Sequence, residues 1–264
     1  MKTVLITGAC GGMGNAAARF FRDRGYLVFA LDRTAPQKEE RIVPVEADVT
    51  SPESLSHALE TVRTHTDHLF AIVHFAGIYM LDSLAEMEDD AFCRIFDVNL
   101  RGVFLVNRTF LPLLKKGSKI LITTSELAPL DPLPFTGIYA VSKAALDRYA
   151  YSLRMELQLL GISVSVLRAG AVRTDMLGAS TDALERFCQS TKLYTCNAER
   201  FRTIVNRVES RCIPPEKIAR KSFAIIRKNH ASFSYHINRN PLLLLLNALP
   251  RRLQFLIIRL ILQP

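Results

Sequence analysis

The sequence predicts an α/β protein: a Rossmann-type, doubly wound parallel sheet in a single domain, followed by an apolar, basic helical tail. Short apolar runs alternate with amphipathic stretches almost from the first residue. These runs are apolar throughout rather than at every second position, as in strands buried on both faces of a parallel sheet. The length of 264 residues fits one such domain, and no linker rich in Pro, Gly or Ser divides it.

The strands and helices can be placed in order along the chain. The first run, TVLITG, covers residues 3–8 and leads into an amphipathic stretch that ends at Gly25, a residue suited to a helix C-cap. Ser51 and Pro52 have the residue types of an N-cap and a first helical position, so a helix begins there. A long helix is expected from about 136 to 160, and further strands are expected at 26–32, 42–48, 69–77, 118–125 and 162–170.

A glycine-rich loop joins the first strand to the first helix. Its sequence, TGACGGMG, spaces Gly8, Gly12 and Gly14 as G-x-x-x-G-x-G. Glycines let such a loop turn sharply and approach a pyrophosphate, which the N–H groups and positive dipole end of the next helix would bind. The alternative interpretation of this loop is a glycine-rich turn from strand to helix that binds no ligand. Asp32 favours a ligand, because a carboxylate that ends the second strand can accept hydrogen bonds from an adenosine ribose.

The same carboxylate predicts NAD as the cofactor, because it would repel the 2′-phosphate of NADP. Arg33 follows directly and could bind that phosphate, so NADP stays as the alternative. The other interpretation of Arg33 is a solvated cation in a surface loop.

Tyr139 and Lys143 stand four residues apart in GIYAVSKAAL, so they share one face of the long helix. A tyrosine with its usual pKa of roughly 10 is a poor acid–base catalyst. A lysine ammonium beside it favours the phenolate and brings that pKa toward neutral pH. Chance places this pair in many helices, but here it follows a nucleotide-type loop and a buried strand that ends in TTS.

Several motifs in the same order resemble the short-chain dehydrogenase/reductase family over about residues 1–240. The glycine loop, with Thr7 in front, matches the family's TGxxxGxG, and Asp48 in ADVT matches its adenine-side aspartate. HFAG stands in place of NNAG, and DVNLRG supplies Asn99 at the position of the catalytic asparagine. RAGAVRT corresponds to the PGxxxT segment beside the nicotinamide. The resemblance implies hydride transfer between a nicotinamide cofactor and a CH–OH group.

The resemblance also implies roles for individual residues. Tyr139 exchanges a proton with the substrate oxygen, Ser125 polarises that oxygen, and Lys143 lowers the tyrosine pKa and holds the nicotinamide ribose. Asn99 keeps a water in line with Lys143, or its side chain fixes the helix backbone. The residues expected to bind the cofactor are Gly8, Gly12, Met13, Gly14, Asp32, Arg33, Asp48, Val49, Ala76, Gly77, Tyr139, Lys143, Val172 and Thr174.

Three positions depart from the family pattern. His74 replaces the first asparagine of NNAG and is expected to be a hydrogen-bonded structural histidine rather than a ligand. Ala169 replaces the usual proline, which is expected to loosen the loop toward the lid. Ser125 lies one residue further from Tyr139 than in the family pattern, so Thr124 is kept as its alternative.

The segment from about 176 to 213 has helical periodicity where the family folds a lid over the substrate. Its apolar residues either line an oily pocket or pack the lid onto the body, and the sequence does not divide them. They are Met176, Leu177, Phe187, Leu193 and Phe201.

The formal charge of +9 is concentrated at the end of the sequence. Residues 1–215 hold 25 Lys and Arg against 24 Asp and Glu, whereas 216–264 hold nine basic residues and one acid. The leucine-rich tail, 241–264, is not expected to span a membrane, because only about eight apolar positions precede Pro250, three arginines follow it, and a spanning helix needs about 20 largely uncharged residues. Two short helices meeting at Pro250 are expected, the second with Arg252 and Arg259 on one face and an apolar face opposite.

That pattern is typical of an interfacial helix on anionic lipid. Burial of the tail against the domain or a partner subunit is the alternative. Nucleic acid is not expected as a partner, because the final 25 residues offer one aromatic residue and mostly aliphatic surface.

The expected function is NAD(P)-dependent oxidation or reduction of a hydrophobic, lipid-like alcohol or ketone, such as a steroid, a retinoid or a long-chain alcohol. The alternative is a 3-oxoacyl-carrier-protein-type reductase, whose NADPH preference would conflict with Asp32 and leave the tail unexplained. A nucleotide-binding scaffold without turnover would not need Asn99, Ser125, Tyr139 and Lys143 together.

The expected location is the cytoplasm, peripheral on the cytoplasmic face of a membrane. No secretory segment is expected at the start, and the five cysteines, read as reduced thiols, lack metal-ligand spacing, so no metal site is expected. The resemblance implies a homodimer or homotetramer, paired through the helices that carry Asn99 and Tyr139.

Overall fold

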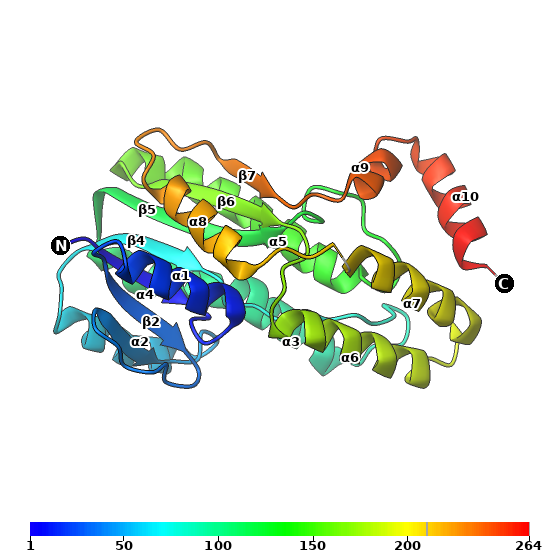
Figure 1. Cartoon of the computed structure of the whole chain (residues 1–264), viewed down its shortest axis with the longest axis horizontal. Coiled ribbons are helices and arrows are strands. Elements are labelled where there is room, and N and C mark those ends of the chain that lie inside the picture. Colours follow the sequence, from blue (N-terminus) through cyan, green and yellow to red (C-terminus); the bar gives the residue numbers. More distant parts are fainter. Residues whose placement is uncertain (210, 264) are drawn as a thin grey trace.

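The structure, a computed structural model, describes the backbone of residues 1–209 and 211–263, and their side chains except those of 175–182 and 206–209. Within that part of the chain, seven parallel strands form one sheet in the order β3-β2-β1-β4-β5-β6-β7 (Figure 1). The strands are β1 (Thr3–Thr7), β2 (Leu27–Asp32), β3 (Ile42–Glu46), β4 (Leu69–His74), β5 (Leu114–Ser125), β6 (Ser163–Ala169) and β7 (Ser234–Ile237).

Helices cover both faces of the sheet, which confirms the doubly wound fold. Their bounds are α1 (Gly12–Arg22), α2 (Pro52–Arg63), α3 (Asp89–Phe96), α4 (Gly102–Phe110), α5 (Gly137–Leu157), α6 (Asp175–Ser190), α7 (Thr195–Glu209), α8 (Pro215–Ile226), α9 (Pro241–Asn247) and α10 (Arg251–Leu262). A π-helical segment, Asp97–Arg101, joins α3 to α4. The short 3-10 segments Leu111–Leu113 and Gln158–Leu160 follow α4 and α5.

Each face of the sheet has its own apolar core. On one face α2, α4 and α5 pack on strand side chains such as Leu5 and Phe29, and on the other α1 and α8 pack on Val4 and Ile6. All five residues of β1 are buried. This two-sided burial explains why the strands are apolar at every position rather than at alternate ones.

The order of the strands positions the functional site. The chain runs outward from β1 to β2 and β3, and then returns to the other side of β1 with β4. The connections therefore diverge between β1 and β4, and in such sheets ligands bind at the carboxyl ends of the strands beside this point. Helices α6, α7, α9 and α10 lie beyond the same end of the sheet (Figure 1).

The edge strand β7 is not among the strands that the sequence predicts. Its four residues are all half-buried, so it lacks the continuous apolar run that marks the inner strands. It pairs with β6, where Ala169 is in register with Ile237 on one side and Ser125 on the other. The backbone at Ala169 is thereby held in the sheet on both sides, up to the last residue of the strand.

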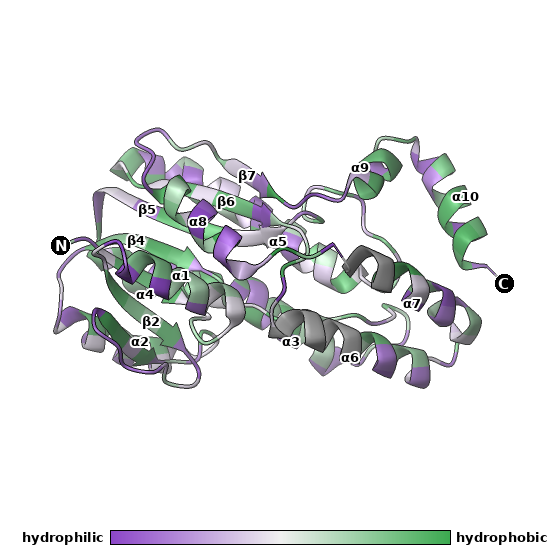
Figure 2. Cartoon of the chain, in the orientation of Figure 1, coloured by the Kyte–Doolittle hydropathy of each residue, from purple (hydrophilic) through white to green (hydrophobic). Residues whose placement is uncertain are grey.

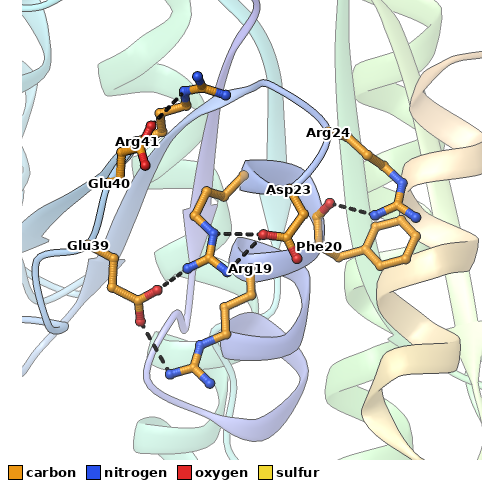
Figure 3. A network of polar contacts seen from close by, with 8 residues as sticks. Arg19, Phe20, Asp23, Arg24, Glu39, Glu40 and Arg41 are labelled. Carbon is orange, nitrogen blue, oxygen red and sulfur yellow. Dashed lines mark hydrogen bonds and ion pairs between the residues drawn. The ribbon is translucent and has the colours of Figure 1, made fainter.

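A surface network holds the loop that follows β2. Glu39, in that loop, accepts hydrogen bonds from Arg19, at 3.2 Å, and from Arg22 of α1 (Figure 3). The guanidinium of Arg24 lies over the ring of Phe20, 3.3 Å from its centroid. Exposed pairs of this kind add little free energy of unfolding, on the order of 0–1 kcal/mol each. Their contribution is to tie the loop after β2 to α1.

His74, the last residue of β4, is a structural histidine, as predicted. Its side chain is 1% exposed, and its Nε2 lies 2.9 Å from Oδ1 of Asn107 on α4. Because that amide oxygen can only accept, Nε2 donates. Asn107 in turn donates to the Tyr149 hydroxyl at 3.2 Å. Burial lowers the pKa of His74 to about 4.

Replacing His74 with glutamine is expected to remove a pH-dependent loss of stability. A histidine whose pKa falls from 6.5 in the unfolded chain to about 4 in the fold stabilises the fold above pH 6.5. That contribution is lost as the pH falls from 6.5 toward 4, at a cost of about 2 kcal/mol between pH 7 and pH 5. Urea unfolding at both pH values should show this loss in the wild type and a smaller one in His74→Gln, whose amide can still donate to Asn107. Equal losses in the two proteins would contradict the assignment.

The tail forms two helices that meet at Pro250, as the sequence predicts. Beyond its first turn, which carries Arg251 and Arg252, α10 is largely hydrophobic (Figure 2). Among the described residues, no helix has the length and apolar character needed to cross a membrane.

Candidate active site

A cleft of about 870 Å³ opens at the carboxyl ends of β1, β2 and β4. It lies at the point of divergence of the strand order, where a nucleotide cofactor is expected. Eleven of the predicted cofactor residues line it: Gly8, Gly12, Met13, Gly14, Asp32, Arg33, Asp48, Val49, Ala76, Gly77 and Thr174. Val172 does not, because its side chain is buried in the core beneath α1 and α8.

The glycine loop is built so closely that side chains would not fit. Gly8 has a φ of +70°, and a Cβ there would lie 2.6 Å from the backbone nitrogen of Ala76. A Cβ on Gly14 would lie 2.0 Å from the carbonyl oxygen of Gly8, and one on Gly12 would lie 2.7 Å from Thr174 Cγ2. The loop therefore packs against β4 and α1 as bare backbone, which leaves its outer side open to the cleft.

Helix α1 begins in this loop, with Gly11 at its N-cap, and none of the described side chains caps it. The first N–H groups of a helix have no partner within the helix, and its dipole favours an anion. The bare glycine backbone and the uncapped helix N-terminus together fit the pyrophosphate of a dinucleotide.

Two carboxylates stand on the adenosine side of the cleft. Asp32 accepts the Cys10 N–H at 2.8 Å and the Arg33 N–H at 2.7 Å, one on each carboxylate oxygen. Asp48 accepts both the N–H and the hydroxyl of Thr50 on one oxygen, each at 2.7 Å. Burial raises the pKa of Asp48, but these hydrogen bonds and the charge of Arg33 bring it below its usual value. Hydrogen bonds thus hold both carboxylates in fixed positions, and the lowered pKa of Asp48 keeps that group ionised.

Ser125, rather than Thr124, faces the reaction site. Ser125 ends β5, is 5% exposed, and forms a hydrogen bond with Tyr139 that lowers the tyrosine pKa. Thr124 points to the opposite face of the strand, as side chains alternate, and its hydroxyl donates to Asp147 of α5 at 3.3 Å. The extra residue between Ser125 and Tyr139 therefore leaves Ser125 in position beside the tyrosine.

Tyr139 and Lys143 lie on α5, one turn apart, beside Tyr79 and Gly77, which line the cleft; the two α5 residues are not themselves part of its lining. Lys143 is 6% exposed, and its Nζ is 5.8 Å from the centroid of the Tyr139 ring. Burial lowers the pKa of Lys143 to about 8. Burial also raises the pKa of Tyr139 above its usual value, and neighbouring Tyr79 raises it further. The lowered tyrosine pKa that the sequence predicts is therefore not produced by the protein groups, because burial outweighs the Ser125 hydrogen bond.

Asn99 fixes the backbone around the site. It is fully buried in the π-helical segment, and its Oδ1 accepts the Ile78 N–H at 2.8 Å. Its amide donates to the Ile78 carbonyl at 3.0 Å and to Ser142 Oγ at 3.1 Å. The Ser142 hydroxyl donates to the Tyr139 carbonyl at 2.8 Å. Asn99 thus ties the loop after β4 to the catalytic helix α5, which is the structural role considered for it.

Gly77 leaves room for the two polar groups of the site. A Cβ at this position would lie 3.1 Å from Asn99 Oδ1 and 3.3 Å from Lys143 Nζ. Gly77 also lines the cleft. The Lys143 Nζ therefore lies close to the cleft wall, at a residue that has no side chain.

Tyr79 is the main residue near the site that the sequence does not predict. Its ring lies 4.8 Å from the ring of Tyr139, at an interplanar angle of 52°, and it lines the cleft. It also packs against the apolar cluster beneath α6 and α7. Other lining residues outside the prediction are Cys10, Gly11, Leu31, Ala47, Thr50, Phe75, Ile78, Asp90, Cys93, Arg94, Asp97 and Val98.

The apolar residues of the predicted lid segment, about 176–213, are expected either to line an oily pocket or to pack the lid onto the body. Phe187 and Phe201 are 3% and 6% exposed and pack with Phe135 in one cluster, so they hold the lid to the body. Leu193 is 66% exposed. Met176 and Leu177 lie outside the residues whose side chains are described.

Comparison with known proteins agrees with the fold. The family described as short chain dehydrogenase matches residues 2–185, and the chain belongs to that family. The description of that family is one of dehydrogenases.

Two curated relatives show the range of similar proteins. The chain is 33% identical to mouse (Mus musculus) estradiol 17-beta-dehydrogenase 2 over 190 residues, which cover 67% of this chain and 50% of that protein. The match therefore spans half the length of the mouse enzyme. Versicolorin reductase 1 of Aspergillus parasiticus is 33% identical over 187 residues, which cover 66% of this chain and 71% of that protein.

A solved structure shows the same fold. The short chain dehydrogenase of Burkholderia cenocepacia, crystallised in complex with NADP, superposes with a TM-score of 0.74. The two chains are 21% identical, and the match covers 98% of this chain and 99% of the other.

Proposed function

We propose that this chain transfers hydride between the carbinol carbon of a hydrophobic, lipid-like alcohol and NAD. The observation that carries the proposal is that Ser125, Tyr139 and Lys143 lie together directly behind two residues that line the glycine-walled cleft, Tyr79 and Gly77. The bare loop backbone, the uncapped helix N-terminus and the fixed carboxylate of Asp32 fit a dinucleotide. When bound, the nicotinamide supplies the hydride acceptor and a positive charge in the cleft.

The protein groups handle the proton. In oxidation, Tyr139 acts as its phenolate, whose oxygen accepts the proton of the substrate alcohol, while the Ser125 hydroxyl hydrogen-bonds the substrate oxygen as its charge develops. Lys143, with a pKa of about 8, can exchange protons near neutral pH, and its charged form acts together with the positive charge of a bound nicotinamide to favour the phenolate, which burial alone disfavours. In reduction the same groups act in reverse, with Tyr139 as the acid. The high pKa of Tyr139 in the protein keeps it protonated for that direction.

Two observations support an apolar substrate. Tyr79 lines the cleft beside Tyr139 and packs against an aromatic cluster, in which the Phe135 ring lies 4.6 Å from Phe187 and 5.2 Å from Tyr194 and from Phe201. The mouse relative is named for estradiol, a steroid alcohol. A flat, apolar alcohol suits such surroundings, because aromatic rings offer a large contact area without polar groups to satisfy.

The tail is proposed to contact an anionic membrane. Leu253, Leu256 and Leu260 form one side of α10 and are 46%, 50% and 66% exposed. Arg252 and Arg259 are exposed beside this strip. Leu242 and Leu245 of α9 are each 64% exposed. On an anionic bilayer, the apolar strip would insert at the boundary between headgroups and acyl chains, and the cations beside it would contact the anionic headgroups.

A second copy of the chain is proposed to cover α4 and α5. A hollow of about 480 Å³ there is lined mostly by apolar residues, including Phe96, Leu100, Phe104 and Tyr149. Phe104 is 42% exposed. Sedimentation of the wild type and of Phe104→Asp should show an oligomer and its dissociation, and a wild-type monomer would exclude this pairing.

The function is tested by following reduced-nicotinamide formation with sterols, retinol, long-chain alcohols and water-soluble alcohols. Each alcohol is assayed with NAD and with NADP, in anionic and in zwitterionic vesicles. The proposal predicts turnover of the lipid-like alcohols, favoured by NAD and by anionic vesicles. Turnover of water-soluble alcohols alone would overturn the proposed substrate class and leave the catalytic residues as assigned.

Replacing Asp32 with serine is expected to lower the preference for NAD over NADP by about 100-fold. The change removes a carboxylate that would face the 2′-phosphate, and juxtaposed like charges cost several kcal/mol. The ratio of kcat/KM for the two cofactors measures the effect. Glu46→Gln is the matched control, because Glu46 is in register with Asp32 on β3 but does not line the cleft. An unchanged ratio in Asp32→Ser would assign cofactor choice to other residues.

A further inference from the structure

The last turn of α10 is bonded to the lid. The Asn197 amide of α7 donates to the carbonyl oxygen of Leu262 at 2.6 Å, and the Arg200 guanidinium donates to that of Gln263. The final carbonyls of a helix have no partners within the helix, so α7 satisfies them from outside. The positive charge of Arg200 also complements the negative end of the α10 dipole.

The same turn is buried in the lid cluster. Leu262 is 9% exposed and Ile258 packs against the cluster, which includes Leu184 and Phe187 of α6 and Phe201 of α7. Gln254, one turn before Ile258 on the same side of α10, is 5% exposed and donates to the Leu249 carbonyl at 2.8 Å. One side of α10 is therefore fixed to protein, whereas the strip of Leu253, Leu256 and Leu260 is open.

The cluster extends from α10 to the catalytic tyrosine. Phe135, at its centre, contacts rings from α6 and α7 and has a φ of +63°. Leu81 and Tyr79, from the loop after β4, pack in the same cluster, and the Tyr79 ring lies 4.8 Å from that of Tyr139. The tail, the lid and the substrate side of the site thus share one apolar core.

We propose that α10 is a structural part of the substrate lid, and that Leu262 is a positioning residue that holds α6 and α7 over the bound hydrophobic alcohol. This inference rests on the proposed function, because the substrate is the one proposed there. Leu262 acts through the lid and does not touch the reacting atoms. Loosening the lid weakens the binding of a large apolar substrate, and it leaves the cleft for the cofactor intact, because that cleft is lined by other residues.

The test compares Leu262→Ala with Ile261→Ala on the full chain, in detergent micelles. Ile261 is the neighbouring residue, is 50% exposed and lies outside the cluster, so it controls for loss of apolar surface on α10. Leu262→Ala is expected to raise KM for the long-chain or steroid alcohol about tenfold, as for loss of a buried leucine contact. Its kcat and its Kd for NAD are expected to change less than about twofold. Ile261→Ala is expected to match the wild type.

A second variant and a second readout keep the test independent of folding and of turnover. Asn197→Ala removes the amide bonded to α10 and is expected to raise the same KM about threefold. Hydrogen exchange of the backbone amides of α6 and α7 is expected to accelerate in Leu262→Ala and not in Ile261→Ala. Equal KM values and equal exchange in the two variants would overturn the role of α10. If the wild type oxidised no alcohol, the proposed function would fail, and exchange alone would decide the role of the tail.

Discussion

Tyr139→Phe is expected to lower kcat about 10³-fold and to leave NAD affinity close to that of the wild type. The change deletes one oxygen atom, the group that accepts the substrate proton in oxidation and donates it in reduction. General acid–base catalysis by a positioned side chain contributes 10²–10⁴-fold, and no other titratable group is assigned to this proton. The ring is kept, so its contact with Tyr79 and the packing of α5 are kept as well.

The matched control is Tyr151→Phe. Tyr151 lies three turns further along the same helix, is 51% exposed, and its ring contacts Phe233 rather than the site. Rapid mixing with saturating NAD and alcohol measures the chemical step, and fluorescence quenching measures cofactor affinity. The variant Tyr151→Phe should match the wild type in both. Near-full turnover by Tyr139→Phe would show that another group carries the proton and would remove the basis of the proposed mechanism.

Gly8→Ala is expected to raise the Kd for NAD about 100-fold or more. The new Cβ would lie 2.6 Å from the nitrogen of Ala76 and 2.8 Å from the carbonyl carbon of Phe75. Both are backbone atoms at the end of β4, so the loop must move away from the strand. That movement displaces the bare backbone and the start of α1, where the pyrophosphate is expected to bind. An energy difference of about 2.7 kcal/mol is enough for this loss of affinity.

Gly25→Ala separates backbone strain from loss of the site. Gly25 has a φ of +81°, close to the +70° of Gly8, but a Cβ there meets no atom within 4 Å. Both variants therefore carry a similar cost of about 1–2 kcal/mol for a left-handed L-residue. Urea unfolding should show that cost in both, whereas calorimetric titration with NAD should show lost affinity only in Gly8→Ala. Equal affinities in the two variants would place the dinucleotide elsewhere.

The sheet could be predicted from the sequence because its inner strands are buried on both faces. β1 shows this most clearly, since every residue is apolar or satisfied by a hydrogen bond within the core. The edge strand β7 could not be predicted in this way. Its residues alternate and are half-buried, so its place depends on pairing with β6, which is a long-range contact.

The glycines that line the cleft could be predicted because the glycine motif dictates the local backbone. The choice between Ser125 and Thr124 could not, because it depends on which face of β5 points to the site. Tyr79 was missed for a related reason. It follows Gly77 in an irregular loop, where no periodicity indicates direction, and the fold alone brings it to Tyr139.

For the tail, the hydropathy pattern of the sequence predicts the helices but not their contacts. The sequence separates the arginines of α10 from its apolar residues, but it does not show which apolar residues pack on the lid. The packed side carries Gln254 together with Ile258 and Leu262, and the open side carries leucines. The glutamine is buried because its amide satisfies the carbonyl of Leu249, a contact that hydropathy cannot indicate.

The most direct test of the central claim is transfer of deuterium from a steroid alcohol labelled at its carbinol carbon. The purified protein is incubated in anionic vesicles with NAD and the labelled or unlabelled alcohol, and the reduced cofactor is isolated for mass spectrometry. The proposed function predicts that the deuterium appears in the reduced nicotinamide, that the labelled alcohol reacts more slowly, and that Tyr139→Phe forms almost no labelled cofactor. Reduced cofactor without deuterium, or none from the wild type, would contradict direct hydride transfer from an apolar alcohol at this site.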